Sequence, residues 1–251
     1  MHPLPLQTSQ ISRSDVTPFI SSYELALAAR EMILAANLPL PKYLLAPEVA
    51  VLLQYFGDLH QQLIIDTFWN VGGRVNEVLA ITPADFHLDG ISPFLVLRTL
   101  KQRERGKGRP RKDERLHRII PLSDPQYVRR VHDYLATFKP PKYERLWPMK
   151  SDNTVRNWVN AAVEAARRDG VTFTVNPISP KTFRDSFAVH LLMNGIPKAV
   201  LQGLLGHKKA ETTEIYTKVF ALDVSQRAGV RFSMAPEDAM AMLRSVPRAV
   251  E

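Results

Sequence analysis

Apolar residues recur along most of the chain at intervals of three and four, the spacing that places them on one face of an α-helix. Proline, glycine or polar caps end these runs, and together they predict helices over residues 21–37, 46–56, 59–71, 74–80, 124–138, 151–170 and 236–246, with further helices from Pro180 onward. Residues 93–100 and 115–122 are instead dense in β-favouring residues and predict two strands. We therefore expect a mainly α-helical fold with one small antiparallel β-sheet (α+β), whose two strands enclose a long loop.

The first forty residues differ from the rest of the chain. Residues 1–21 are polar and contain spaced prolines, which is typical of a mobile arm. The helix expected after them has Leu25, Ala28, Ala29, Met32 and Ile33 as its apolar positions, and the proline-containing stretch 38–42 ends it. This segment is too short for an independent domain, so we expect an arm and a short helical segment over 1–43 and one large domain over 44–251.

Composition narrows the class of protein. Of the 251 residues, 45% are apolar and 23% are charged, as in a soluble globular protein. No apolar run approaches the roughly 20 residues that cross a bilayer, and the N-terminus lacks the pattern of a signal peptide. The absence of cysteine excludes disulfides and thiol nucleophiles, and it fits a cytoplasmic protein. The seven histidines lack metal-ligand spacing, so we expect no metal site.

Positive charge is concentrated in one place. The net charge is +8, and residues 101–118 hold nine Lys or Arg against three Asp or Glu, a surplus of six. A basic run in the loop between two strands suits a polyanionic partner such as DNA.

Three segments carry side chains suited to chemistry at a phosphodiester. They surround Arg74, Arg184, and the pair His207 and Tyr216. Attack on phosphorus needs a nucleophile and cations that neutralise the non-bridging oxygens. Arginine suits the second role because its planar fork binds phosphate in a bidentate manner, and tyrosine suits a covalent step that must later be reversed. Spacing alone does not link the segments.

Taken together, the three segments resemble the signature boxes of the tyrosine recombinase (phage integrase) family. "GGRVNEVLAI" resembles the first box, "KTFRDSFAVHLLMNG" the second and "LLGHKKAETTEIYTKV" the third, including nine residues from His207 to Tyr216. The resemblance spans about 44–220. It implies the catalytic-domain fold of that family, and it makes residues 1–43 a truncated version of its core-binding region.

The resemblance implies a role for each matching residue. Arg74 and Arg184 clamp the scissile phosphate, His207 donates a hydrogen bond to it, and Glu77 orients the first box. Tyr216 attacks and forms a 3′-phosphotyrosine, so the ring must be accessible and near both guanidinium groups. No cofactor is needed, because the phosphotyrosyl bond conserves the bond energy.

Two positions depart from the family pattern. Lys181 stands where the second box usually begins with histidine; we expect it to stabilise charge, and the general base stays unassigned. Asp185, at a position that is often histidine, is expected only to tune Arg184. The family's general acid is a lysine in the hairpin: Lys101 is the best placed and Lys107 is the rival. Other hairpin cations are expected to contact DNA: Arg103, Arg105, Arg109, Arg111 and Lys112.

Each residue alone has a simpler explanation; Arg74 and Glu77, for example, have the spacing of an ordinary helix ion pair. In combination the boxes favour a bacterial site-specific DNA recombinase. The resemblance implies that it acts as a homotetramer on two DNA sites with inverted repeats and exchanges strands through a Holliday junction. Plasmid multimer resolution or mobile-element integration and excision would be its task, and 236–246 would dock into a neighbouring protomer. The alternatives are a catalytically impaired DNA-binding regulator on the same fold and a type IB topoisomerase.

Overall fold

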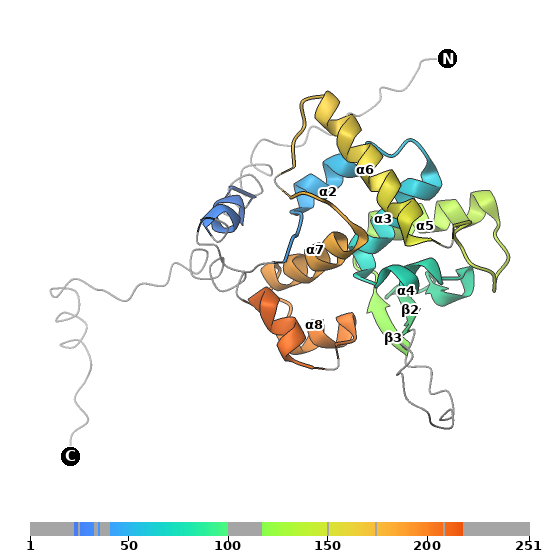
Figure 1. Cartoon of the computed structure of the whole chain (residues 1–251). Coiled ribbons are helices and arrows are strands. Elements are labelled where there is room, and N and C mark those ends of the chain that lie inside the picture. Colours follow the sequence, from blue (N-terminus) through green and yellow to red (C-terminus); the bar gives the residue numbers. More distant parts are fainter. Residues whose placement is uncertain are drawn as a thin grey trace, which may run out of the picture.

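The computed structural model describes residues 23–24, 26–32, 35, 41–99, 117–149, 151–173, 175–207 and 209–217. Helices dominate these ranges (Figure 1). They are α2 (Ala46–Leu53), α3 (Leu59–Val71), α4 (Val75–Leu79), α5 (Pro125–Phe138), α6 (Asp152–Arg168), α7 (Pro180–Met193) and α8 (Lys198–Leu205). Residues 26–32 and 211–217 are also helical. None of the helices in the described ranges is long and apolar enough to span a lipid bilayer.

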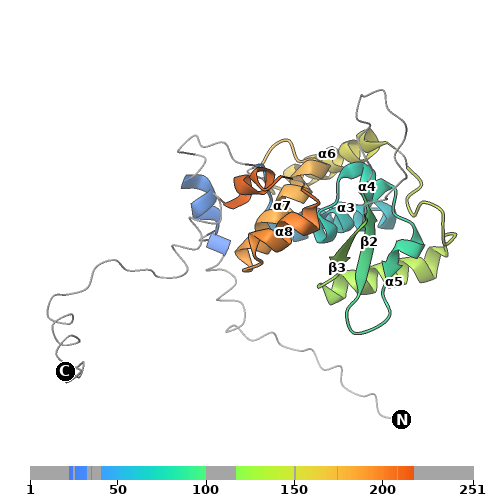
Figure 2. The same ribbon diagram turned by 90° about the horizontal axis from the view of Figure 1, so that it is seen from below.

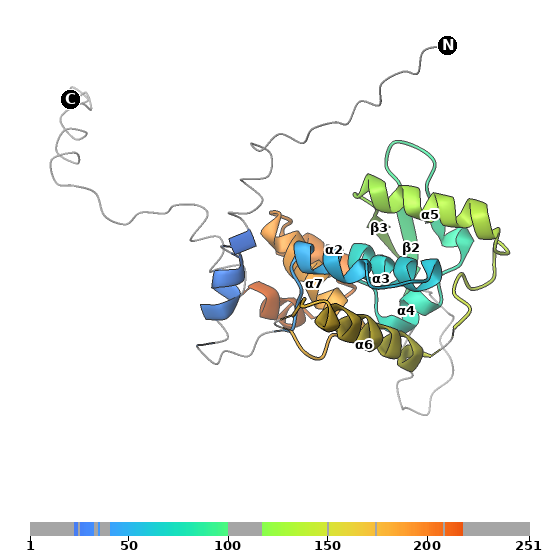
Figure 3. The same ribbon diagram turned by 90° about the horizontal axis from the view of Figure 1, so that it is seen from above.

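A small antiparallel sheet lies at one end of the helical body, with α5 alongside it (Figures 2 and 3). Its order is β1 (Phe86–His87), β2 (Phe94–Arg98) and β3 (His117–Pro121). Strands β2 and β3 pair from Phe94 opposite Pro121 to Arg98 opposite His117. The expected α+β class is confirmed, and β1 is an addition to the two expected strands. Residues 100–116, which carry the expected basic loop, lie outside the described residues.

Helix α3 has the ends that its sequence predicts. The Asp58 side chain accepts hydrogen bonds from the backbone N–H groups of His60 and Gln61, which caps the N-terminus. Gly72 ends the helix with a φ of 60°, the left-handed conformation that glycine adopts without strain. A Cβ at Gly72 would lie 2.2 Å from Cδ1 of Phe187 on α7. The glycine therefore allows the end of α3 to approach α7 closely.

Helix α7 lies between two hydrophobic clusters. The larger cluster joins α3, α5, α6 and the sheet, and includes Phe183 of α7. The second contains Phe187 and Leu192 of α7, Leu201 of α8 and Tyr216. Residues 183–189 of α7 are buried, and Arg184 is among them.

The helical N-terminal segment packs on the same body. Ala26 belongs to the second cluster, and buried Arg30 donates two hydrogen bonds of 2.8 Å to the carboxylate of Glu48 on α2. The expected apolar face was wrong in part: Met32 is 57% exposed and Ala28 is exposed. The ion pair with Glu48 orients the helix by a contact that apolar periodicity does not reveal. The division of the chain at residues 43 and 44 stays a prediction.

Candidate active site

Arg74 lies at the N-terminus of α4 and reaches toward the third box. Its Nη1 donates to Glu77 Oε1 at 3.0 Å, and its backbone N–H donates to Glu77 Oε2 at 2.9 Å. Its Nη2 is 3.5 Å from the carbonyl oxygen of Gly206. The side chain remains 45% exposed, so the guanidinium can also meet a ligand in solvent. The helix ion pair with Glu77 is thus present, and it fixes the arginine beside the third box.

Arg184 joins three segments that are distant in sequence. Its Nη1 donates to the carbonyl of Gly72 at 2.6 Å, and its Nη2 donates to the carbonyl of Leu205 at 2.7 Å. The same Nη2 is 3.1 Å from Nε2 of His207. Burial, together with the nearby charge of Arg74, lowers the pKa of Arg184 to about 10, so the group stays cationic at neutral pH.

His207 is held by a contact at each ring nitrogen. Because Arg184 can only donate, Nε2 accepts its hydrogen bond, and Nδ1 lies 3.0 Å from the hydroxyl of Thr213 and donates to it. Burial and the charges of Arg184, Arg74 and Arg118 lower the pKa of His207 to about 4. The imidazole is therefore neutral at pH 7. Thr213 is fully buried, and the sequence reasoning did not identify it.

Tyr216 is buried, with 5% of its surface exposed, and the expectation of an accessible ring was wrong for this conformation. Its hydroxyl donates a 2.8 Å hydrogen bond to Oδ1 of Asp185, and its ring packs in the second hydrophobic cluster. Burial and the Asp185 carboxylate raise the pKa of the phenol above its ordinary value, although Arg184 and Arg74 partly offset the rise. The phenol is thus near both arginines, but protonated and turned toward a carboxylate.

Asp185 contacts the nucleophile candidate rather than the arginine beside it. Its Oδ2 accepts a 2.5 Å hydrogen bond from Nζ of Lys181, one turn earlier on α7, while Oδ1 accepts from Tyr216. We expected Asp185 to act only on Arg184. Its carboxylate instead bridges Lys181 and Tyr216, because α7 turns the side chain at 185 toward the helix 211–217. Lys181 is 75% exposed, so its ammonium can leave Asp185 for an incoming anion.

Glu77 makes the contacts of an orienting residue, and one of its partners was missed. Besides Arg74, its carboxylate accepts hydrogen bonds from Nη2 of Arg118 at 2.5 Å and Nη1 at 3.2 Å. Burial would raise the pKa of Glu77, but the hydrogen bonds and charge of Arg118 hold it below its ordinary value. Glu77 is therefore a carboxylate that links two arginines.

The remaining expected residues lie outside the described parts of the chain. Lys101 and its rival Lys107 do so, as does the expected docking helix at 236–246. The same applies to the expected DNA contacts Arg103, Arg105, Arg109, Arg111 and Lys112.

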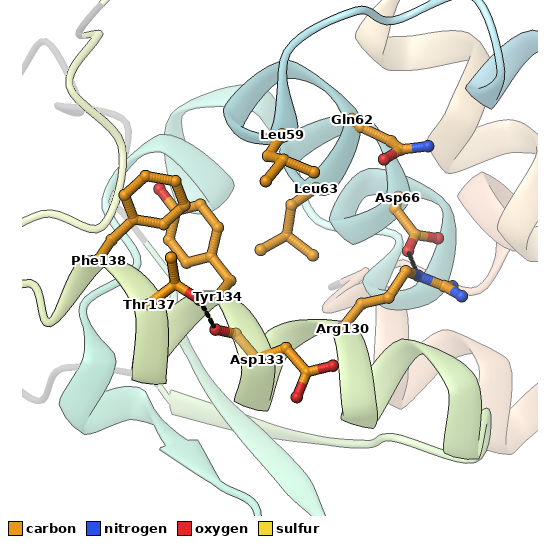
Figure 4. Close-up of a pocket in the computed structure, with 9 residues that line it drawn as sticks. All are labelled: Leu59, Gln62, Leu63, Asp66, Arg130, Asp133, Tyr134, Thr137 and Phe138. Carbon is orange, nitrogen blue, oxygen red and sulfur yellow. Dashed lines mark hydrogen bonds and ion pairs between the residues drawn. The ribbon is translucent and has the colours of Figure 1, made fainter.

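A hollow of about 240 Å³ between α3 and α5 lies apart from these residues (Figure 4). Leu59, Leu63, Tyr134 and Phe138 line it, with the ion pair between Arg130 and Asp66 at one end. None of the candidate residues contributes to its wall. Within the described ranges, no three His, Asp or Glu side chains gather in an arrangement that could hold a metal ion.

The geometry suits an anion. Arg74 and Arg118 both donate to the carboxylate of Glu77, and Arg184 donates to the neutral His207, so three arginines share one carboxylate and the cluster carries a surplus of positive charge. Two guanidinium groups can bind a phosphate, and the nearby phenol can attack its phosphorus once the phenol is released from Asp185.

Comparison with known proteins agrees with this description. A family model described as the phage integrase family matches residues 42–222. A resolvase of Escherichia coli (strain K12) is 47% identical over 91% of this chain and 90% of its own length. A probable site-specific recombinase in the afa region of Escherichia coli is 39% identical over 97% of both chains.

Solved structures show the same fold. The crystal structure of the XerA recombinase is similar over 85% of this chain and 77% of that chain, with 21% identity and a TM-score of 0.56. A post-cleavage complex of the XerH site-specific recombinase is similar over 76% of this chain and 54% of that one, with 20% identity and a TM-score of 0.57. The chain belongs to the phage integrase family, the site-specific tyrosine recombinases.

Proposed function

We propose that this protein is a site-specific DNA recombinase that cuts and rejoins DNA through a 3′-phosphotyrosine at Tyr216. The observation that carries the proposal is the convergence of the three boxes: Arg184 Nη2 lies 3.1 Å from His207 Nε2, and Arg74 Nη2 lies 3.5 Å from the carbonyl of Gly206. Tyr216 is tied to the residue that follows Arg184. A phosphate bound here would meet two guanidinium groups, an imidazole and a phenol.

The two arginines would divide the work of binding the scissile phosphate. Arg74 is the more exposed and would meet the phosphate first. Arg184 is fixed by the carbonyls of Gly72 and Leu205, so its position is set before DNA arrives. Such preorganised cations stabilise the charge that develops on the non-bridging oxygens in the transition state.

His207 would donate to the phosphate after a change in its hydrogen bonding. In the described conformation Nε2 accepts from Arg184, so it has no proton to give. The negative charge of a bound phosphate offsets the arginines that lower the pKa of His207, so it favours a proton on Nε2 that can be donated to the phosphate while Arg184 stays on its two carbonyls. Lys181 would add a donor, and Lys101 or Lys107 would protonate the leaving 5′-oxygen.

The nucleophile must first leave Asp185. The hydrogen bond between Tyr216 and Asp185 keeps the proton on the phenol and keeps the ring in the second cluster. When Lys181 turns to the phosphate, Asp185 loses a counter-ion, and a carboxylate beside the phosphate would repel it. We infer that the described conformation is a resting state and that the helix 211–217 moves before cleavage.

The resolvase relative favours a resolution task, because the similarity extends over nearly the whole of both chains. We propose that four protomers hold two duplexes with inverted-repeat sites and exchange strands through a Holliday junction. Residues 236–246 would dock into a neighbouring protomer. Deleting 234–251 should then abolish the two-duplex complex in a gel-shift assay and spare binding to a single site. Normal recombination by the truncated protein would contradict this docking role.

The test of the chemistry is a suicide substrate nicked beside the cleavage site. The wild-type protein should form a covalent adduct that survives denaturing electrophoresis, and Tyr216→Phe should form none. Tyr127→Phe is the matched control, because Tyr127 is also buried and donates one hydrogen bond, to Thr67, away from the site. It should form adduct at the wild-type rate.

The same experiment separates the leading proposal from a regulatory one. A buried, carboxylate-bound Tyr216 is the feature that favours a DNA-binding regulator with impaired chemistry. Specific DNA binding without adduct in the wild-type protein would support the regulator. Relaxation of supercoiled DNA that lacks any specific site would instead indicate a topoisomerase.

A further inference from the structure

Arg118 on β3 is a buried arginine for which the proposed chemistry has no role yet. Its side chain is 8% exposed, and both of its terminal nitrogens contact the carboxylate of Glu77, at 2.5 and 3.2 Å. Nη1 also donates to the hydroxyl of Thr99 at 3.1 Å, just beyond β2. Its Nε is buried without a hydrogen-bond partner among the described residues. Arginines are almost never buried unless they are paired, and Glu77 supplies the partner here.

The first consequence concerns Arg74. Glu77 holds Arg74 at two points, the backbone N–H and Nη1, and Arg118 grips both oxygens of the same carboxylate. Because Glu77 is buried, solvent does little to orient it, and its direction depends on the two arginines that hold it. Arg118 therefore fixes the carboxylate that aims Arg74.

The second consequence concerns the loop that carries His207. Gly206 has a φ of 63°, and a Cβ there would lie 3.3 Å from Nη1 and 3.4 Å from Cδ of Arg118. The third box thus rests against the Arg118 side chain, and Arg74 contacts the carbonyl of the same glycine. The charge of Arg118 is also one of the three that lower the pKa of His207, with Arg184 of α7 and Arg74.

A neighbouring ion pair shows that this arrangement is not a general feature of the sheet. Arg98 on β2 donates to buried Asp85 through Nε at 3.2 Å and Nη2 at 2.8 Å. Its side chain is 39% exposed, and the partner that it holds lies outside the three boxes. The two arginines make similar pairs on adjacent strands, but of the two it is Arg118 that joins the first box to the third.

We propose that Arg118 is a positioning residue for DNA cleavage. It holds the Glu77 carboxylate, and through it Arg74, in place against the loop that carries His207. The inference rests on the proposed recombinase function. It predicts that Arg118 affects the chemical step rather than DNA affinity, because its guanidinium is covered and DNA contact falls to exposed cations.

The experiment compares Arg118→Met and Arg118→Lys with Arg98→Met as the matched control. Single-turnover adduct formation on the suicide substrate and the DNA dissociation constant are measured for each, with thermal unfolding as a check of folding. Arg118→Met should slow adduct formation about 10-fold to 100-fold, the cost of a misplaced catalytic group, and leave the dissociation constant within about twofold. Arg118→Lys keeps the charge but loses the fork, so it should give an intermediate rate. Arg98→Met should match the wild type.

The second readout does not depend on catalysis. The His207 imidazole is titrated by NMR in the free proteins. Its pKa should rise in Arg118→Met, stay low in Arg118→Lys and stay low in Arg98→Met. Because Arg118→Lys keeps the charge, slower cleavage in that variant with an unchanged His207 pKa would separate the effect of position from that of charge. If Arg118→Met does not fold, Arg118→Lys carries the test through its slower cleavage.

The outcomes separate this inference from the proposed function. Wild-type adduct formation with equal rates in all folded variants would overturn the positioning role of Arg118, whatever the His207 pKa does. A wild-type protein that forms no adduct would overturn the proposed function, and the His207 titration would still decide whether Arg118 acts on the third box.

Discussion

Replacing Asp185 by Asn isolates the contact that restrains Tyr216. The substitution keeps the shape of the side chain and an oxygen that can accept from the phenol, but it removes the negative charge. Asp185 is 3% exposed and Tyr216 is 5% exposed, so solvent screens their interaction little. The partner on the other oxygen, Lys181, is largely exposed, so removing this ion pair should affect stability only slightly.

The magnitude follows from the strength of the hydrogen bond. A bond to a charged acceptor contributes about 2 kcal/mol, and a bond between neutral groups about 1 kcal/mol. Release of the phenol should therefore cost about 1 kcal/mol less in Asp185→Asn, which raises the released population about fivefold. If release limits cleavage, adduct should form about fivefold faster.

The assay is single-turnover adduct formation on the suicide substrate at saturating protein. Asp133→Asn, which removes an exposed carboxylate from α5, is the matched control and should leave the rate unchanged. The double variant Asp185→Asn with Tyr216→Phe should form no adduct. A rate that falls tenfold or more in Asp185→Asn would refute the restraint and would instead make Asp185 the acceptor of the phenol proton.

Three further predictions concern stability and DNA binding. Gly72→Ala should be at least about 2 kcal/mol less stable than Gly170→Ala in denaturant unfolding, because both glycines have a positive φ but of the two only Gly72 faces Phe187. Equal losses of stability would argue against the close packing of α3 on α7. The pKa of His207 is about 4 in the folded protein and near 6.5 in the unfolded chain, so the unfolded chain takes up the proton first as the pH falls. The free energy of unfolding should therefore fall by about 1–2 kcal/mol as the pH drops from about 6.5 toward 4. This loss should be absent in His207→Gln, measured by unfolding at each pH, and a loss that persists would place its source elsewhere. Neutralising the hairpin cations should make the slope of log affinity against log salt concentration shallower by about 0.9 for each DNA phosphate that the variant no longer neutralises. An unchanged slope would place the DNA-binding surface elsewhere. The cations are Arg103, Arg105, Lys107, Arg109, Arg111 and Lys112.

Local signals predicted the helices well. The apolar run 59–71 with its glycine stop gives the bounds of α3, and Asp124 caps α5 as expected, because both depend on neighbours in the sequence. Strand β1 was missed because two residues leave no periodic pattern. The orientation of the helix at 26–32 depends on the ion pair of Arg30 with Glu48, a contact between distant residues that apolar periodicity cannot supply.

The site was predictable only as a set of residues. The family motifs, and not their spacing, placed Arg74, Arg184 and His207 together, and the structure brings these three side chains into one cluster. Thr213 and Arg118 were missed because their partners are decided by packing across the fold. The burial of Tyr216 depends likewise on a side chain from another helix.

The most direct test of Tyr216 as the nucleophile is to locate the covalent bond itself. The protein–DNA adduct from the suicide substrate would be digested with nuclease and protease, and mass spectrometry would identify the peptide that keeps the nucleotide remnant. We expect one modified peptide, joined through a 3′-phosphate to Tyr216, and its absence in Arg184→Ala. Attachment at another residue, or an unmodified Tyr216 alongside cleaved DNA, would contradict this chemistry.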